Sequence, residues 1–129
     1  MDVVEASFSC DLCGKLIATA QLVPAGMPHP DALPGDRAGG TIIWDYLGRN
    51  SEMVGPAQYP AVRTALADGD PRALYAVDKL WVPFYCPACD RCYCLDHWKV
   101  EAVFDSDFAG WYDCSYGTCP AGHRRIIDD

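Results

Sequence analysis

Cysteine and histidine residues are concentrated in segment 86–97 of this 129-residue chain. That segment holds a Cys-x-x-Cys and a Cys-x-x-His, with one further cysteine between them. Another Cys-x-x-Cys lies near the N-terminus, and a Cys-Pro-Ala-Gly-His sequence lies near the C-terminus. A Cys-x-x-Cys turn, or a Cys-x-x-His in the first turn of a helix, directs two ligand atoms to one point. Zinc prefers four such ligands in a tetrahedron, so the pattern predicts two zinc ions per chain.

The order of the four pairs predicts how the two ions share them. Only four residues separate Cys89 from Cys94, which is short for a hairpin that would fold the two central pairs onto one ion. We therefore expect pairs one and three on one ion and pairs two and four on the other. The first predicted zinc site is Cys10, Cys13, Cys94 and His97, and the second is Cys86, Cys89, Cys119 and His123. Cys92 and Cys114 are spare, and either could replace a neighbouring ligand.

Other chemistries for these residues fit less well. A scaffold of four disulfides would leave the histidines without a role, whereas paired Cys-x-x-Cys spacing is typical of metal sites. The cysteine-rich ligand sets are closed, while a catalytic zinc usually keeps one position open for water. A nucleobase deaminase needs a His-x-Glu upstream of its Pro-Cys-x-x-Cys motif, and this chain has none. We therefore predict structural zinc ions and no catalytic residue.

The interleaved ligand order resembles the cross-brace of RING and B-box zinc fingers, which act in ubiquitin pathways. The sequence Cys10-Asp11-Leu12-Cys13 is similar to their opening Cys-x-Ile-Cys, and Cys94-Leu95-Asp96-His97 would be the third ligand pair. The resemblance implies that Leu12 contacts a conjugating enzyme. The chain departs from the family in residues 14–85, a 72-residue insertion between the first two pairs. The Cys-Pro-x-Cys that usually closes a RING is here the second pair.

Charge and hydropathy narrow the choice of partner. A net charge of -8 disfavours nucleic acids and anionic membrane surfaces, which attract Lys-rich and Arg-rich proteins. No apolar run reaches transmembrane length, and residues 1–5 lack the features of a secretion signal. We therefore expect a cytoplasmic protein that binds a protein partner, with no nucleic acid and no membrane. The sequence leaves the oligomeric state open.

The rest of the chain must position the ligand pairs. The expected elements are strands at 15–23, 41–47 and 122–127, two helices within 59–80, and extended chain at 82–85, with a short helix as the alternative for 41–47. Asp70 is expected to cap the second helix, with Pro71 as its first residue. Segment 24–40 is rich in Pro and Gly and predicts an exposed loop, as does the turn-rich segment 105–110. Segment 98–104 is compatible with helix continuation or with a strand, and most aromatic side chains are expected to fill the core.

These observations predict one α+β domain over residues 1–129. It would contain short strands, two or three short helices and two interleaved zinc sites of the cross-brace or treble-clef kind. The predicted function is a zinc-stabilised protein-interaction module without catalysis. The alternatives are a RING-like adaptor of a ubiquitin-like conjugation system and a zinc-dependent enzyme.

Overall fold

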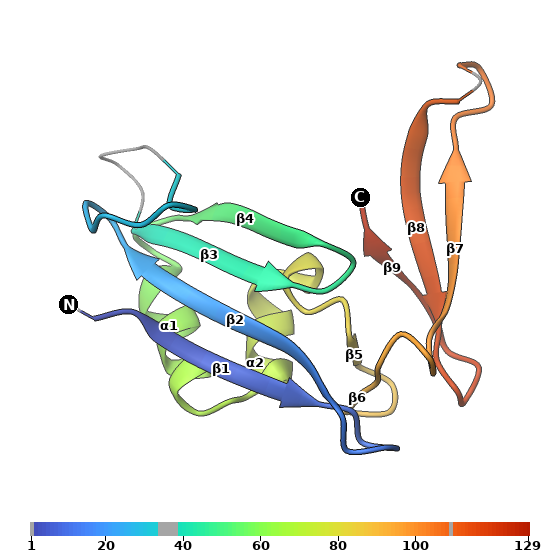
Figure 1. The fold of residues 1–129 in the computed structure, drawn as a ribbon, viewed down its shortest axis with the longest axis horizontal. Coiled ribbons are helices and arrows are strands. Elements are labelled where there is room, and N and C mark those ends of the chain that lie inside the picture. The colour runs from blue at the N-terminus through green and yellow to red at the C-terminus, as the bar shows by residue number, and fades with distance from the viewer. Residues whose placement is uncertain (1, 34–38, 109) are drawn as a thin grey trace.

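The computed structural model describes residues 2–33, 39–108 and 110–129, and its strands form three antiparallel sheets (Figure 1). Their strand orders are β1-β2-β3-β4, β5-β6 and β7-β8-β9. The elements follow one another as β1 (Val4–Ser9), β2 (Leu16–Pro24), β3 (Gly40–Asp45), β4 (Arg49–Val54), α1 (Tyr59–Ala67), α2 (Pro71–Val77), the 3-10 helix η1 (Lys79–Trp81), β5 (Tyr85–Cys86), β6 (Arg91–Cys92), β7 (Lys99–Phe104), β8 (Tyr112–Thr118) and β9 (Arg124–Asp128).

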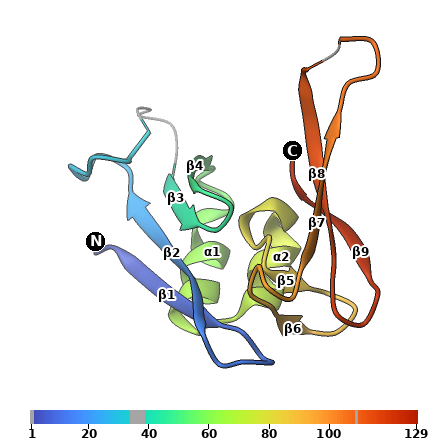
Figure 2. The same ribbon diagram turned by 45° about the vertical axis from the view of Figure 1, so that its right-hand side comes forward.

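The four-stranded sheet packs against both α-helices on one face, as Figures 1 and 2 show. Its first strand alternates buried and exposed side chains, so that Ala6 and Phe8 point into the core. These two residues lie opposite Ala20 and Ala18 of β2. Alternation of this kind is typical of a strand with one face in the core and one face in solvent.

The two helices form as the sequence predicts. The carboxylate of Asp70 accepts a hydrogen bond from the Ala73 N–H at 3.1 Å, and Pro71 is the first helical residue of α2. The chain reverses between the helices at Gly69, whose φ of +61° favours glycine. The predicted break and cap are therefore confirmed.

The strands were predicted less completely. The three expected strands correspond to β2, β3 and β9, and segment 98–104 forms β7 rather than a helix. Sequence analysis missed β1, β4 and β8, as well as the short β5-β6 pair. Within the Pro/Gly-rich segment, residues 25–33 contain turns and no regular element, while Pro24 and Gly40 belong to strands. Residues 34–38 of that prediction lie outside the described residues.

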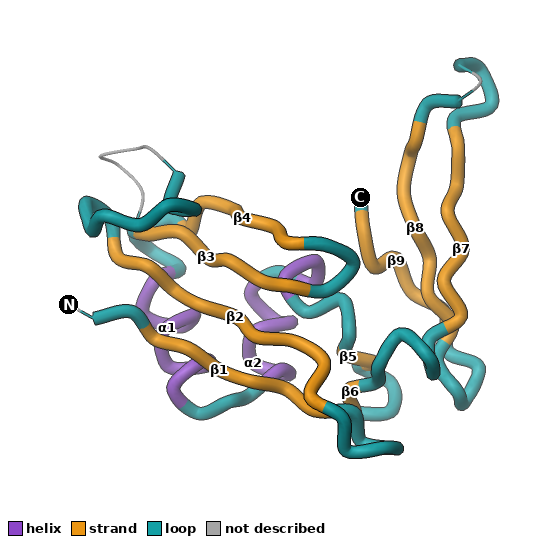
Figure 3. The backbone as a smooth tube through the Cα atoms, in the orientation of Figure 1, coloured by secondary structure: helices purple, strands orange, loops and turns teal. Residues whose placement is uncertain are grey.

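The predicted α+β fold with cross-brace or treble-clef zinc sites is wrong. The described chain is mostly β, with nine strands in three sheets and two short α-helices. Cys94 to His97 form a turn instead of the first turn of a helix, and the chain continues into β7. The buried side chain of Trp98 donates from Nε1 to the Phe84 carbonyl at 3.2 Å, which holds the start of this segment against the core. Residues 14–85, an insertion relative to a RING finger, contain most of the main sheet and both helices (Figure 3).

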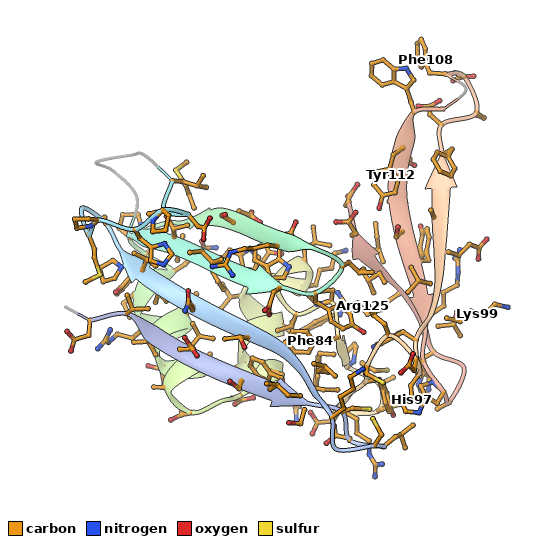
Figure 4. The ribbon with its side chains drawn as sticks, viewed as in Figure 1. Phe84, His97, Lys99, Phe108, Tyr112 and Arg125 are labelled. Atoms are coloured by element: carbon orange, nitrogen blue, oxygen red, sulfur yellow. The ribbon has the colours of Figure 1, made fainter. Side chains whose placement is uncertain are left out.

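Arg125 of β9 attaches the third sheet to the rest of the molecule (Figure 4). Its guanidinium donates to the carbonyls of Val82 at 2.9 Å and Tyr85 at 2.7 Å. It also donates to the Lys79 carbonyl at 2.6 Å. One forked side chain therefore satisfies three carbonyls along the connection from η1 to β5.

Gly117 of β8 allows the same sheet to approach the core. A Cβ atom at this position would lie 2.9 Å from Cε3 of Trp98 and 3.2 Å from two side-chain carbons of Ile127. Both contacts are shorter than ordinary van der Waals separations, and both neighbouring side chains are buried. Only glycine lets β8 cross the indole at this distance.

We predict that Arg125→Lys lowers the free energy of unfolding by about 2–3 kcal/mol, because an ammonium cannot reproduce the fork that reaches three carbonyls. Arg124→Lys is the matched control, since the Arg124 guanidinium stacks 3.7 Å above the Tyr116 ring without a comparable set of carbonyls. Its cost should stay within about 1 kcal/mol. Urea unfolding of metal-loaded protein measures both values, and equal losses would contradict this role of Arg125.

Candidate metal centre

The structure brings eight candidate ligands together in two groups of four. Within each group, the sulfur and imidazole nitrogen atoms all lie within 4.8 Å of one another. The first group is Cys10, Cys13, Cys94 and His97, and the second is Cys86, Cys89, Cys119 and His123. These are the same two sets that the order of the ligand pairs predicts. Their role as metal ligands stays a prediction.

The first group has the dimensions of a tetrahedral zinc site. The sulfurs of Cys13 and Cys94 are 3.9 Å apart. Nδ1 of His97 lies 3.4 Å from the Cys10 sulfur and 3.1 Å from the Cys94 sulfur. Usual zinc–ligand distances in a tetrahedron place two sulfurs about 3.8 Å apart and a sulfur and a nitrogen about 3.6 Å apart. The Cys13–Cys94 and Cys10–His97 separations are close to these edges, and the Cys94–His97 separation is shorter.

The second group has the same dimensions. The sulfurs of Cys89 and Cys119 are 3.7 Å apart. Nδ1 of His123 lies 3.7 Å from the Cys86 sulfur, 3.2 Å from the Cys89 sulfur and 3.4 Å from the Cys119 sulfur. In both groups the histidine presents Nδ1, so the two donor sets are chemically equivalent. The residues present thus fit zinc in both places.

The first group joins the β1-β2 turn to the turn after β6. The Cys10–Cys13 turn closes through a hydrogen bond from Gly14 N–H to the Cys10 carbonyl at 2.8 Å, with Gly14 at a φ of +73°. Asp11 in this turn makes two hydrogen bonds to Cys92: its N–H donates to the Cys92 carbonyl at 2.8 Å, and its carboxylate accepts the Cys92 N–H at 2.6 Å. The turn is therefore fastened to β6 directly beside the ligands.

The second group joins the β5-β6 turn to the β8-β9 turn. The N–H of Cys119 donates to the His123 carbonyl at 2.9 Å, and the chain reverses at Gly122, where φ is +91°. The His123 N–H also points to the Cys119 sulfur at 3.4 Å. In the opposite turn, the Tyr85 hydroxyl donates to the carboxylate of Asp90 at 2.6 Å. Both ligand pairs are thus held by hairpins (Figure 3), whose shape depends on hydrogen bonds close to the ligands.

Backbone N–H groups prepare one thiol of each group for ionisation. Burial acts to raise the pKa of Cys10, but N–H groups of its own turn and of Cys94 outweigh this effect and lower the pKa to about 6. Burial likewise opposes ionisation of Cys119, yet the N–H groups of His123 and Ala121 lower its pKa to about 7. Zinc binds the thiolate form, so each group contains a sulfur that is charged near neutral pH without a large proton cost.

Two other thiols, those of Cys86 and Cys94, are less acidic in the absence of an ion. Burial, the largest effect, raises the pKa of Cys86 to about 11 and also raises the pKa of Cys94. A divalent cation at the centre of each group would favour their thiolates and remove this penalty. The donor chemistry therefore matches a cation better than an empty cluster of buried thiols.

Cys92 and Cys114, the predicted substitutes, belong to neither group. Both are buried. Burial, together with the nearby carboxylate of Asp11, raises the pKa of Cys92 to about 12, so its thiol stays protonated. Burial also raises the pKa of Cys114.

Sequence reasoning missed Asp11 as a positioning residue. It occupies a variable position of the Cys-x-x-Cys motif, and its partner Cys92 was considered for its thiol and not for its backbone groups. Spacing within a motif indicates which atoms can meet inside one turn, but it does not predict a contact with a residue 81 positions away.

We predict that Cys13→Ser removes one metal ion per chain, whereas Cys114→Ser leaves the metal content unchanged. Cys13 is exposed and Cys114 is buried. If the substitutions acted through packing alone, Cys114→Ser would therefore have the larger effect. Elemental analysis of the purified variants distinguishes the two outcomes. Equal metal content in both variants would show that Cys13 is not a ligand.

Comparison with known proteins assigns this chain to a family. No curated protein and no solved structure matches this chain. In the part of the chain that the structure describes, none of the helices is long and apolar enough to cross a membrane. One family model, described as "Domain of unknown function (DUF8328)", matches residues 1–129. Because this match extends over all 129 residues, the chain belongs to the DUF8328 family.

Proposed function

We propose that this protein is a protein-interaction module stabilised by two structural zinc ions, with no catalytic role for the metals. The observation that supports it best is the pair of closed Cys3His groups. Each group supplies four protein donors with tetrahedral separations, which leaves no coordination position for a water or a substrate. A catalytic zinc usually has three protein ligands, so a structural role fits these donor sets better.

The position of the groups supports the same role. Each one connects two turns that are distant along the chain, and each turn contributes one ligand pair. A structural zinc site contributes about 10–16 kcal/mol of apparent binding free energy near neutral pH. The net stability of a domain is about 5–15 kcal/mol, so the two ions would decide whether hairpins β5-β6 and β8-β9 stay in place.

Reduced cysteines support a proposed cytoplasmic location. All eight cysteines of the chain are free thiols in the structure. Disulfides are rare in the reducing cytosol, where thiolates remain available to bind metal. The protein partner is likewise a proposal, which rests on the acidic charge of the chain and on apolar side chains that remain at its surface.

A RING-like adaptor is the second candidate, although the fold is not of the expected kind. Leu12 and Leu95, one from each ligand turn of the first group, are both exposed. In the RING resemblance, the position of Leu12 contacts a conjugating enzyme. We retain this candidate because two exposed leucines lie beside the first proposed zinc site.

Metal content and thiol reactivity test the structural role. We predict two zinc ions per chain, with at most Cys92 and Cys114 reactive toward a thiol reagent before chelation. After chelation all eight cysteines should react, since the other six are protected as ligands. One zinc per chain, or six reactive thiols in the metal-loaded protein, would contradict two closed sites.

The adaptor candidate has a separate test. If it holds, the protein accelerates discharge of a ubiquitin-like modifier from its conjugating enzyme, and Leu12→Ala abolishes the acceleration while both zinc ions remain bound. Leu33→Ala is the control, because Leu33 is also exposed but lies outside both groups. No discharge by the parent protein, or equal discharge by both variants, removes the adaptor candidate.

A further inference from the structure

The end of the β7-β8 hairpin carries a cluster of exposed aromatic side chains. We call it the hairpin-end cluster, and its members are Phe104, Phe108, Trp111 and Tyr112. Trp111 is 70% exposed and Phe108 is 62% exposed. The other three tryptophans of the chain are buried. Most aromatic side chains do fill the core as predicted, and the hairpin-end cluster is the exception.

The hairpin projects away from the rest of the molecule, as Figures 2 and 4 show. Strand β7 is exposed along its whole length apart from the half-buried Val103. In the described part of the chain β7 pairs with β8 alone, so its other edge is open. Exposed aromatic rings at the end of a projecting hairpin contribute little to a core, and large apolar side chains left at a surface commonly mark an interaction site.

Hydrogen bonds within the hairpin end hold the backbone that carries the rings. The N–H of Asp105 donates to the Trp111 carbonyl at 2.8 Å, and the N–H of Trp111 donates to the Phe108 carbonyl at 3.0 Å. The carboxylate of Asp105 accepts the N–H groups of Asp107 at 2.7 Å and Phe108 at 3.3 Å. The ring centroids of Phe108 and Trp111 are 5.9 Å apart. A surface that is ordered before binding loses less entropy when a partner arrives.

The hairpin that carries the cluster is acidic. The hairpin carries Glu101, Asp105, Asp107 and Asp113, and all four are exposed. Its only basic residue over 99–118 is Lys99, which lies at the base of the hairpin, far from the cluster (Figure 4). Aromatic faces attract cations, and carboxylates beside them add to that attraction.

We propose that the hairpin-end cluster binds an arginine-rich segment of a partner protein. This inference rests on the proposed function and names the surface and the chemistry of the partner. The guanidinium group stacks on aromatic planes and pairs with carboxylates at its edge, whereas a lysine ammonium is a more strongly hydrated point charge. A second copy of the chain would bring like charges together, and an anionic membrane would be repelled by the same carboxylates.

The test uses the full-length, metal-loaded protein and three short peptides of identical length, in which glycine alternates with arginine, lysine or glutamate. Calorimetric titration at physiological ionic strength gives the affinities. We expect the arginine peptide to bind several-fold more tightly than the lysine peptide, and the glutamate peptide not to bind. Equal affinity for the arginine and lysine peptides would indicate attraction to net charge alone and would overturn the proposal.

Variants locate the binding surface. Trp111→Ala and Phe108→Ala should each weaken binding of the arginine peptide about tenfold, as expected for the centre of an interface. Asp107→Asn should weaken it by a smaller factor, because one carboxylate is lost at an exposed site. Met53→Ala is the control: this exposed side chain lies on β4, outside the hairpin, and its loss should leave the affinity unchanged. Unchanged affinity in Trp111→Ala and Phe108→Ala would overturn the proposal.

Other occupants of the cluster give different results. A dimer in sedimentation that Trp111→Ala dissociates, without peptide binding, would assign the cluster to a second copy and overturn the proposal. Binding to phosphatidylcholine vesicles that Trp111→Ala abolishes, again without peptide binding, would assign it to a membrane. Zinc is measured on every sample. If the protein holds two zinc ions but does not bind the arginine peptide through the hairpin-end cluster, only this inference is refuted. If it binds the peptide through the cluster but holds no zinc, only the structural zinc proposal is refuted.

Discussion

The arrangement of the hairpins depends on one constraint. In each group, four ligand atoms from two distant turns must meet at a single point. Cys10 and His97 are 87 residues apart, and Cys86 and His123 are 37 residues apart, yet each pair meets within one group. Closing such loops costs conformational entropy that increases with loop length. A metal–thiolate site supplies enough free energy at a single point to offset this cost. Ions at both points would then fix how the hairpins lie relative to the four-stranded sheet.

Phe84, which is completely buried, connects the ligand groups to the four-stranded sheet (Figure 4). Its ring lies 4.9 Å from the Phe8 ring of β1 and 5.6 Å from the Tyr46 ring, while its carbonyl accepts hydrogen bonds from the Tyr93 N–H and the Trp98 indole. One residue thus packs against the sheet with its side chain and holds the segment around Cys94 and His97 with its backbone carbonyl. Together with Arg125, it explains how the third sheet remains attached although few of its residues enter the core.

Sequence analysis predicted the four ligand pairs and the two helices because each depends on local chemistry, and the short spacing between Cys89 and Cys94 indicated how the pairs are shared. A Cys-x-x-Cys turn brings its sulfurs together wherever it occurs, and Asp70 before Pro71 begins a helix through neighbouring backbone groups. The fold class was wrong where the outcome depends on distant partners. Polar residues predominate in β4, so that strand has no apolar pattern and forms because β3 lies beside it. Segment 98–104 has no local preference between helix and strand, and pairing with β8 decides it.

The short segment 86–97 contributes a ligand pair to each group: Cys86 and Cys89 belong to the second, and Cys94 and His97, just beyond β6, belong to the first. An ion at either group would immobilise this one segment, so a second ion would no longer have to overcome the entropy lost in ordering it. Occupancy of the two groups would therefore be thermodynamically linked, and loading would be cooperative rather than independent. By reciprocity, withdrawal of either ion loosens the remaining one, so intermediates with a single ion should be sparsely populated during titration with a chelator.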